Sequence, residues 1–248
     1  DLIDDKTFLI GMTHVSNALG TVCPVRKVVE HAKALGIPVL VDGAQGVPHL
    51  DIDVQDLGCD FYAFSGHKMF GPTGTGVLYG REALLEAMPP WQGGGDMILE
   101  VTFDKTIYND LPYKFEAGTP NIAGVVGLGA AIDYLQAIGM PRIAAYEHEL
   151  HDYMVGELKK VEGIRLIGEA RDKASVQSFL LDDIHSHDLG TILDHQGVAI
   201  RTGHHCAMPA MQRLGISGTS RASVALYNNR GDIDRLVDAL GKAKEIFA

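Results

Sequence analysis

Cysteine is scarce in this chain, and no two cysteines lie close together. The 248 residues contain three, Cys23, Cys59 and Cys206, and no C-x-x-C pair. A disulfide-stabilised miniprotein needs an even, closely spaced set, and a zinc ribbon needs paired cysteines, so the spacing argues against both. Scattered free thiols are typical of a reducing compartment, and we expect the protein to be cytoplasmic.

Long apolar runs and an excess of positive charge are also missing. No stretch approaches the roughly 20 apolar residues that span a bilayer, and the first residues, Asp1–Asp5, do not resemble a secretion signal. Lys and Arg number 21 against 32 Asp and Glu, and the resulting formal charge of −11 opposes binding to a phosphate backbone. We therefore expect neither a membrane nor a nucleic acid as partner.

Apolar runs of strand length alternate with helical patterns in the first half of the chain. The run Thr7–Thr13 precedes helical spacing over Pro24–Leu35, and the β-branched run Ile37–Val41 follows. This order predicts a β-α-β unit whose second strand is buried on both faces. Further strands and a helix are expected at Phe61–Phe64, Gly76–Tyr79 and Glu82–Met88. The pattern predicts an α/β/α domain with a mostly parallel sheet.

The composition changes near Gly139. Glu116–Asn121 opens a helix of small residues that runs to about Ile138. A second helix is expected at Arg142–Val161, with one apolar face formed by Ile143, Tyr146, Leu150, Met154 and Leu158. Strands at Ile164–Ile167 and Val176–Leu181 and helices at Leu189–His195 and Ile233–Ile246 complete the pattern. We expect residues 1–138 to belong to the large α/β domain and residues 139–248 to form a smaller C-terminal α+β domain.

An aspartate and a lysine follow two of the predicted strands. Asp42 directly follows the Ile37–Val41 run, and Lys68 follows the Phe61–Phe64 run. Singly, an aspartate there is more often a cap and a lysine a solvated surface residue. Together they supply the amine that carries pyridoxal phosphate and the carboxylate that keeps its ring nitrogen protonated. Polar residues and a glycine-rich loop accompany them: Gln45, Ser65, His67 and Gly71–Gly76.

Six segments spread over the chain resemble the cysteine desulfurases of the SUF type, the second desulfurase group within the class-V aminotransferases. They read HVSNALG, VDGAQ, SGHKMFGPTGTG, FEAGTPN, RTGHHCAMP and RASVALYN. The resemblance implies a fold-type I enzyme with pyridoxal 5'-phosphate as cofactor. It implies that Lys68 forms the Schiff base, that Asp42 pairs with the ring nitrogen and that Gln45 bonds the ring hydroxyl. It also implies that the phosphate is bound by Ser65 and His67 and, across a homodimer interface, by Thr119. By the same resemblance, Asn17 and Arg221 bind the substrate carboxylate, and Arg201 lies at the mouth of the site.

Cys206 distinguishes a desulfurase from an aminotransferase. A thiolate is a strong nucleophile, and Arg201, His204 and His205 precede it as neighbours that can favour this form. The resemblance implies that Cys206 takes sulfur from L-cysteine as a persulfide, leaving L-alanine. The sulfur then passes to an acceptor protein of the SufE/SufU type for iron–sulfur cluster assembly. Cys23 and Cys59 lack such neighbours, and we expect them to be buried structural thiols.

Two other activities and one inactive role stay open. Selenocysteine lyase and cysteine sulfinate desulfinase use the same cofactor and depend less on the thiol. The phosphate-binding threonine turn and the ring-stacking aromatic or histidine of the family are not found, so we expect an N-terminal portion to be lacking. A chain without them could instead be an inactive binding fragment that docks the sulfur acceptor.

Other motifs in the chain are set aside. The histidines of Asp182–Asp188, His185 and His187, are expected on a solvated loop, and with His204 and His205 they form no convincing metal site, so no metal is expected. Glu147–His151 (EHELH) has the wrong histidine spacing for a zinc protease and is interpreted as the exposed face of a helix. Gly74, Gly76 and Gly80 miss the dinucleotide-binding spacing.

Overall fold

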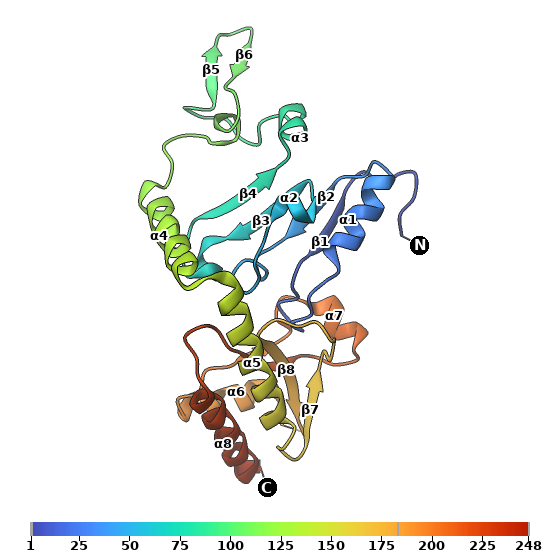
Figure 1. The fold of residues 1–248 in the computed structure, drawn as a ribbon, viewed down its shortest axis with the longest axis vertical. Coiled ribbons are helices and arrows are strands. Elements are labelled where there is room, and N and C mark those ends of the chain that lie inside the picture. The colour runs from blue at the N-terminus through green and yellow to red at the C-terminus, as the bar shows by residue number, and fades with distance from the viewer. Residues whose placement is uncertain (1, 183, 248) are drawn as a thin grey trace. The chain divides into compact units, whose positions relative to one another are not determined.

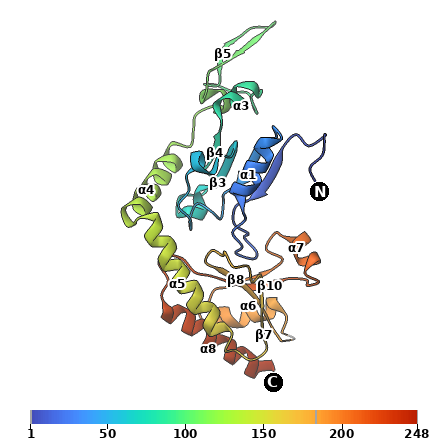
Figure 2. The ribbon, with the colours of Figure 1, turned by 45° about the vertical axis from the view of Figure 1, so that its right-hand side comes forward.

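The computed structural model describes residues 2–182 and 184–247, which form two compact units (Figures 1 and 2). The first unit contains the residues up to Met12 together with Pro24–Pro48 and Ile52–Ala137. The second unit contains Thr13–Cys23, His49–Asp51 and the chain from Ile138 onward. Two short segments from the range expected in the large domain, Thr13–Cys23 and His49–Asp51, therefore pack within the second unit.

A four-stranded sheet in the order β1-β2-β3-β4 forms the centre of the first unit (Figure 1). Its strands are β1 (Ile10–Thr13), β2 (Val39–Asp42), β3 (Phe61–Ser65) and β4 (Gly76–Gly80). β2 and β3 are parallel, whereas β4 runs antiparallel to β3. The short loop from residue 66 to residue 75 explains this reversal, because a parallel return needs a crossover of a dozen or more residues. The α/β class agrees with the sequence prediction.

Helix α1 (Val25–Ala34) covers this sheet through the apolar face that its sequence spacing predicts. Val25, Val29 and Ala32 lie at helical intervals and are at most 4% exposed. They pack in one cluster with Val39 and Val41 of β2. Burying each valine contributes about 1.5 to 3 kcal/mol, so this contact fixes β2 and therefore the position of its last residue.

Several shorter elements complete the first unit. They are α2 (Val54–Leu57), the 3-10 turn η1 (Gly66–Met69), α3 (Glu82–Ala87), the hairpin β5 (Ile98–Val101) and β6 (Thr106–Tyr108), η2 (Tyr113–Phe115) and α4 (Ile122–Ile138). The β5–β6 hairpin was not predicted. Its strands are almost entirely exposed, so they lack the alternation of apolar and polar residues that marks a half-buried strand.

The second unit is built on an antiparallel sheet in the order β7-β8-β10-β9. The strands are β7 (Ile164–Ile167), β8 (Val176–Leu181), β9 (Arg201–Gly203) and β10 (Thr219–Ser223), and the helices are α5 (Met140–Leu158), α6 (Ser186–His195), α7 (Met208–Arg213) and α8 (Arg230–Phe247). β9, β10 and α7 were not predicted. β10 reads TSRAS, which is polar, yet Thr219 and Ser220 are buried because β10 is a central strand.

Three expectations about the second unit are wrong. Glu147 and His151 are 1% and 6% exposed, so EHELH is not a solvated face. The Glu147 carboxylate accepts a hydrogen bond from the Ser175 hydroxyl at 2.8 Å and lies 2.7 Å from His49 Nδ1. Tyr146, expected on the apolar face, is 40% exposed. The expected loop Asp182–Asp188 is helical from Ser186 onward, and its residue 183 lies outside the described residues.

None of the helices in the described ranges is by itself long and apolar enough to cross a membrane; only α4 and α5 taken together pass such a test, and only by length and composition.

Candidate functional site

Asp42 and Lys68 follow neighbouring parallel strands at the same edge of the first unit's sheet. Asp42 is the last residue of β2 and pairs in register with Ala63 of β3. Gly43 extends this pairing, because its N–H donates to the Ala63 carbonyl at 2.8 Å. Lys68 lies in η1, which begins directly after β3. The carboxyl ends of parallel strands are where α/β sheets place ligand-binding groups, as the sequence prediction assumed.

The loop that carries Lys68 is closed by backbone hydrogen bonds. Gly66 N–H donates to the Thr75 carbonyl at 2.9 Å, and Gly71 N–H donates to the Gly66 carbonyl at the same distance. A Cβ atom on Gly66 would lie 2.6 Å from Thr75 Oγ1, so only glycine fits this turn without a shift. The Lys68 side chain is exposed and makes no hydrogen bond or ion pair with any described residue.

The carboxylate and the amide at this edge are less confined. Asp42 is exposed, and its Oδ1 accepts a hydrogen bond from the Ala44 N–H at 2.9 Å, while Gln45 is half-buried. Below them, Tyr62 is 2% exposed, and burial is the main cause that raises the pKa of its hydroxyl above the ordinary value. Tyr62 is therefore the buried part of this edge, whereas Asp42 and Lys68 are exposed.

Ser65 and His67 flank Lys68, and Thr119 lies on a distant segment that packs on the same loop. Asn121 Nδ2 donates to the Gly74 carbonyl at 3.5 Å, and its Oδ1 caps the start of α4 by accepting from the Gly124 N–H. Thr119 itself is exposed, and within the described ranges no hydrogen bond joins it to Ser65 or His67. Its expected role at a phosphate across a dimer interface stays a prediction.

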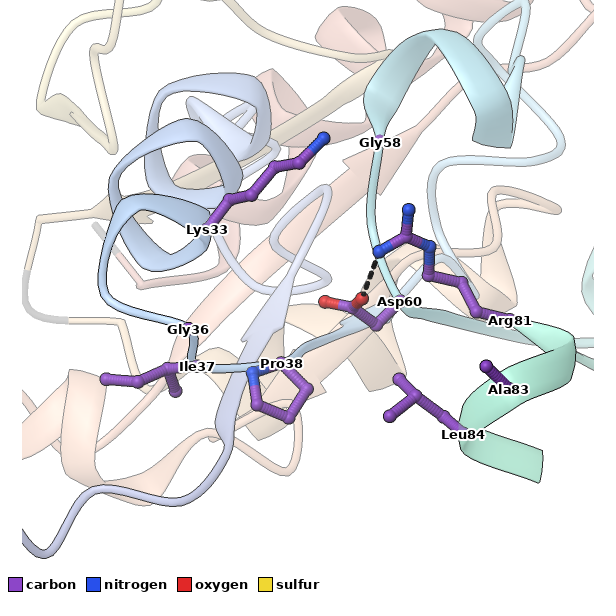
Figure 3. Close-up of a pocket in the computed structure, with 9 residues that line it drawn as sticks. All are labelled: Lys33, Gly36, Ile37, Pro38, Gly58, Asp60, Arg81, Ala83 and Leu84. Atoms are coloured by element: carbon purple, nitrogen blue, oxygen red, sulfur yellow. Dashed lines mark hydrogen bonds and ion pairs between the residues drawn. The ribbon is translucent and has the colours of Figure 1, made fainter. Parts of the chain in front are cut away.

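A pocket of about 280 Å³ lies at the opposite edge of the same sheet (Figure 3). Its lining includes Pro38, which precedes β2, Asp60, which precedes β3, and Arg81, which follows β4. Arg81 donates to Asp60 Oδ1 at 3.1 Å, which neutralises the charge there. The pocket contains none of the residues predicted to bind a ligand, so it is not part of the candidate site.

Cys206 lies in the second unit, on the loop between β9 and α7, and its side chain is exposed. Arg201 Nη2 donates to Cys206 Sγ at 3.6 Å, and the Cys206 N–H donates to His204 Nδ1 at 3.1 Å. The other two thiols differ. Cys59 is buried and Cys23 is partly buried, and burial raises the pKa of both. Cys206 is therefore the accessible thiol with a guanidinium beside it.

His205 was expected to favour the thiolate as a neighbour, and this expectation is wrong. Its ring is 2% exposed, with Nε2 lying 2.8 Å from Thr219 Oγ1. Burial, followed by the charges of Arg221 and Arg201, lowers the pKa of His205 to about 4. The ring is neutral at neutral pH and supplies no charge to the sulfur. Nothing in the sequence of the adjacent residues His204 and His205 indicates which of the two rings is buried.

Asn17 and Arg221 lie close to this loop, although they are far apart in the sequence. Asn17 Nδ2 donates to the His205 carbonyl at 2.5 Å, and Arg221 Nη1 donates to the Asn17 carbonyl at 2.6 Å. Arg221 pairs in register with Arg201 across β10 and β9. Burial, and secondarily Arg201, lowers the pKa of Arg221. Two guanidiniums, an amide and a thiol thus converge in the second unit, a set suited to an anionic substrate group and sulfur chemistry.

Comparisons with known proteins agree with these features. Residues 1–236 match the family model described as Aminotransferase class-V. The chain is 52% identical over 247 residues to the cysteine desulfurase of Yersinia pestis (strain Pestoides F), covering 99% of this chain and 61% of that protein. It is 50% identical over 246 residues to the probable cysteine desulfurase of Xylella fastidiosa (strain 9a5c), covering 99% of this chain and 59% of that protein.

A solved structure shares the fold of the whole chain. The cysteine desulfurase CsdA of Escherichia coli, in its S-sulfonic acid form, superposes with a TM-score of 0.95 at 42% identity. The match covers 99% of this chain and 61% of that one. The apo cysteine desulfurase of Thermococcus onnurineus NA1 gives a TM-score of 0.91 at 40% identity, over 96% and 60% of the two chains. The chain thus spans about three-fifths of the length of these relatives.

Proposed function

Because the chain belongs to the class-V aminotransferase family, we propose that it is the catalytic portion of a pyridoxal-phosphate-dependent cysteine desulfurase. The reaction converts L-cysteine to L-alanine and leaves the sulfur on Cys206. One observation carries the proposal: Cys206 is exposed and receives a hydrogen bond from Arg201, in a chain where Asp42 ends β2 and Lys68 follows the neighbouring β3. An aminotransferase has no use for a nucleophilic thiol, whereas a desulfurase requires one.

The residues of the first unit fit pyridoxal phosphate chemically. Lys68 would carry it through its free amine, Asp42 would face the ring nitrogen, and Gln45 would bond the ring hydroxyl. Ser65 and His67 would bind the phosphate, and Thr119 would do so from a second copy in a homodimer. When bound, the cofactor withdraws electrons from the substrate and so weakens the bonds at its α-carbon. The exposure of the Lys68 and Asp42 side chains supports this assignment.

The chain's own residues then have separate tasks. Asn17 and Arg221 bind and orient the substrate carboxylate, for which a guanidinium is the favoured partner. The freed Lys68 amine holds and moves the α-proton. The Cys206 thiolate attacks the substrate sulfur, so that an S–S bond forms as the C–S bond breaks. The carbon keeps the electron pair of the broken bond and is protonated to alanine, and Cys206 retains the sulfur as a persulfide.

The persulfide must then leave Cys206. An acceptor protein of the SufE/SufU type with its own thiol would attack the outer sulfur and regenerate Cys206, and the sulfur would serve iron–sulfur cluster assembly in the cytoplasm. Arg201 at the loop and the exposure of Cys206 support a thiol partner that approaches from solvent.

The decisive experiment is to add pyridoxal phosphate to the chain, reduce the product with borohydride and map the modified lysine by mass spectrometry. We expect the adduct on Lys68, its absence in Lys68→Ala, and an unchanged yield in Lys27→Ala, which removes another exposed lysine of the same unit. Adduct on other lysines with none on Lys68 would overturn the cofactor assignment.

The second arm tests the thiol. Cys206→Ala should keep the Lys68 adduct but lower alanine formation from cysteine by about 100-fold or more, because the nucleophile is lost. If that variant forms alanine from cysteine at the original rate, Cys206 is not the nucleophile. If it loses cysteine turnover yet still acts on selenocysteine or cysteine sulfinate, those substrates do not need the thiol, and the assignment to Cys206 is strengthened.

A further inference from the structure

We infer that His205 is a positioning residue for the nucleophile: its buried ring, bound to Thr219, holds the loop that presents Cys206 to Arg201. This inference rests on the proposed function of Cys206. His205 touches neither substrate nor cofactor in the proposed reaction, so its action on the chemistry passes through the cysteine next to it.

The two neighbouring side chains lie in opposite environments. His205 is 2% exposed, and its Nε2 lies 2.8 Å from the hydroxyl of Thr219, which is fully buried. Cys206 is exposed. Thr219 pairs with Gly203 across β10 and β9, so the anchor is one strand away from where the loop begins. A hydrogen bond at this place fixes the loop to the sheet and leaves Cys206 on its outer side.

The backbone of the loop requires such an anchor. His205 and Cys206 have φ angles of +54° and +58°, in the left-handed region that residues with a Cβ seldom occupy. Two such residues in succession are strained and persist only when surrounding contacts hold them. The contacts here are Asn17 Nδ2 to the His205 carbonyl at 2.5 Å, and the Ala207 N–H to the His204 carbonyl at 2.9 Å.

Charge around the ring explains why His205 has a geometric role and no electrostatic one. Arg201, Arg221 and His204 all face it and disfavour its protonation, in addition to burial. The positive group at the sulfur is therefore Arg201, whose Nη2 is 3.6 Å from Sγ. This contact depends on the loop conformation, so weakening the anchor should uncouple Cys206 from Arg201 even where the protein stays folded.

The test is a double-mutant cycle read by alkylation of Cys206 with iodoacetamide, quantified on the peptide that contains it. Arg201→Met should lower the rate constant about fivefold in the original chain, since a nearby guanidinium favours the reactive thiolate. In a Thr219→Val background, which removes only the hydroxyl, the same substitution should change the rate by less than about 1.5-fold. Ser220→Ala is the matched control, because Ser220 is buried on the same strand and its Oγ has no partner among the described residues.

Conservative variants keep the outcome interpretable. In a His205→Gln background, whose amide reaches about as far as Nε2, Arg201→Met should still lower the alkylation rate by most of its original factor. The same is expected in a Thr219→Ser background. An equal Arg201 effect in the Thr219→Val and original backgrounds would overturn the inference and leave His205 as core packing. If Thr219→Val does not fold, the comparison of Thr219→Ser and His205→Gln with His205→Leu decides in the same way. Because alkylation needs neither cofactor nor substrate, failure of the proposed function would appear separately, as absence of alanine formation.

Discussion

The two units hold their functional groups in different ways. In the first unit Lys68 and Asp42 are exposed, and among the described residues their only side-chain hydrogen bond is that of Asp42 with the Ala44 N–H. In the second unit Arg221 donates to the Asn17 carbonyl, and Asn17 donates to the His205 carbonyl. The His205 ring in turn pairs with Thr219, next to the exposed Cys206. The first unit positions its groups by backbone alone, and the second by side chains that depend on one another.

This difference predicts how each unit responds to change. Substitutions that remove an outward-pointing side chain of the first unit should act locally and add independently, whereas substitutions in the second unit should couple. Damage to the first unit should come instead through its backbone and the core beneath it. Hydrogen exchange followed by mass spectrometry reads each unit separately and is the measurement for the three predictions below.

Gly43→Ala should give the largest effect and should be confined to the first unit. A Cβ at position 43 would lie 1.9 Å from Cε1 of Tyr62, which is 2% exposed and cannot move without disturbing β3. We expect a loss of about 3 kcal/mol in the free energy of opening of β2 and β3, at the upper end of ordinary overpacking. Gly11→Ala is the control, because a Cβ there meets nothing within 4 Å. Equal protection of β2 and β3 from hydrogen exchange in the two variants would show that Tyr62 can shift to make room for the added Cβ.

Acid should act more strongly on the second unit. Burial lowers the pKa of His205 from its ordinary value of 6.5 to about 4. As the pH falls below about 6.5, His205 binds a proton in the unfolded chain but not in the folded chain. The free energy of unfolding therefore decreases until about pH 4. From about pH 7 to about pH 5 this linkage amounts to about 2 kcal/mol. Above about pH 6.5 His205 contributes no slope.

His205→Gln should remove that part of the pH dependence, and His187→Gln, which replaces an exposed histidine of the same unit, should not. A residual slope is expected in both variants, because burial also lowers the pKa of His14 and His151. Identical slopes for the two variants would contradict a neutral, buried His205.

Lys68→Ala should give the smallest effect. The side chain is exposed and bonds to no described residue, so the free energy of opening should change by less than about 0.5 kcal/mol. Lys27→Ala provides the reference for an exposed lysine in the same unit. A clearly larger loss for Lys68→Ala would mean that the first unit, like the second, relies on its functional side chains for stability.

Sequence patterns predicted the helices and strands that alternate or repeat clearly. α1, β3, β7 and β8 lie within a residue or two of the expected ranges, because each has an apolar face in the period of its structure. β10 was missed because its small polar residues are buried by its central place in the sheet, which leaves no hydrophobic period to detect. Glu147 and His151 were placed on the wrong face of α5 for the same reason, since buried polar residues with partners look like surface residues.

What the sequence determined by itself is the local chemistry. Asp42 and Lys68 after neighbouring strands, and Cys206 close to Arg201, follow from local patterns along the chain. Only the tertiary structure decided that His205 points inward while His204 meets the Cys206 backbone, and that Asn17 bonds to both His205 and Arg221. Those contacts join residues up to 204 positions apart, and the partner of a buried polar atom is set by the packing of distant strands.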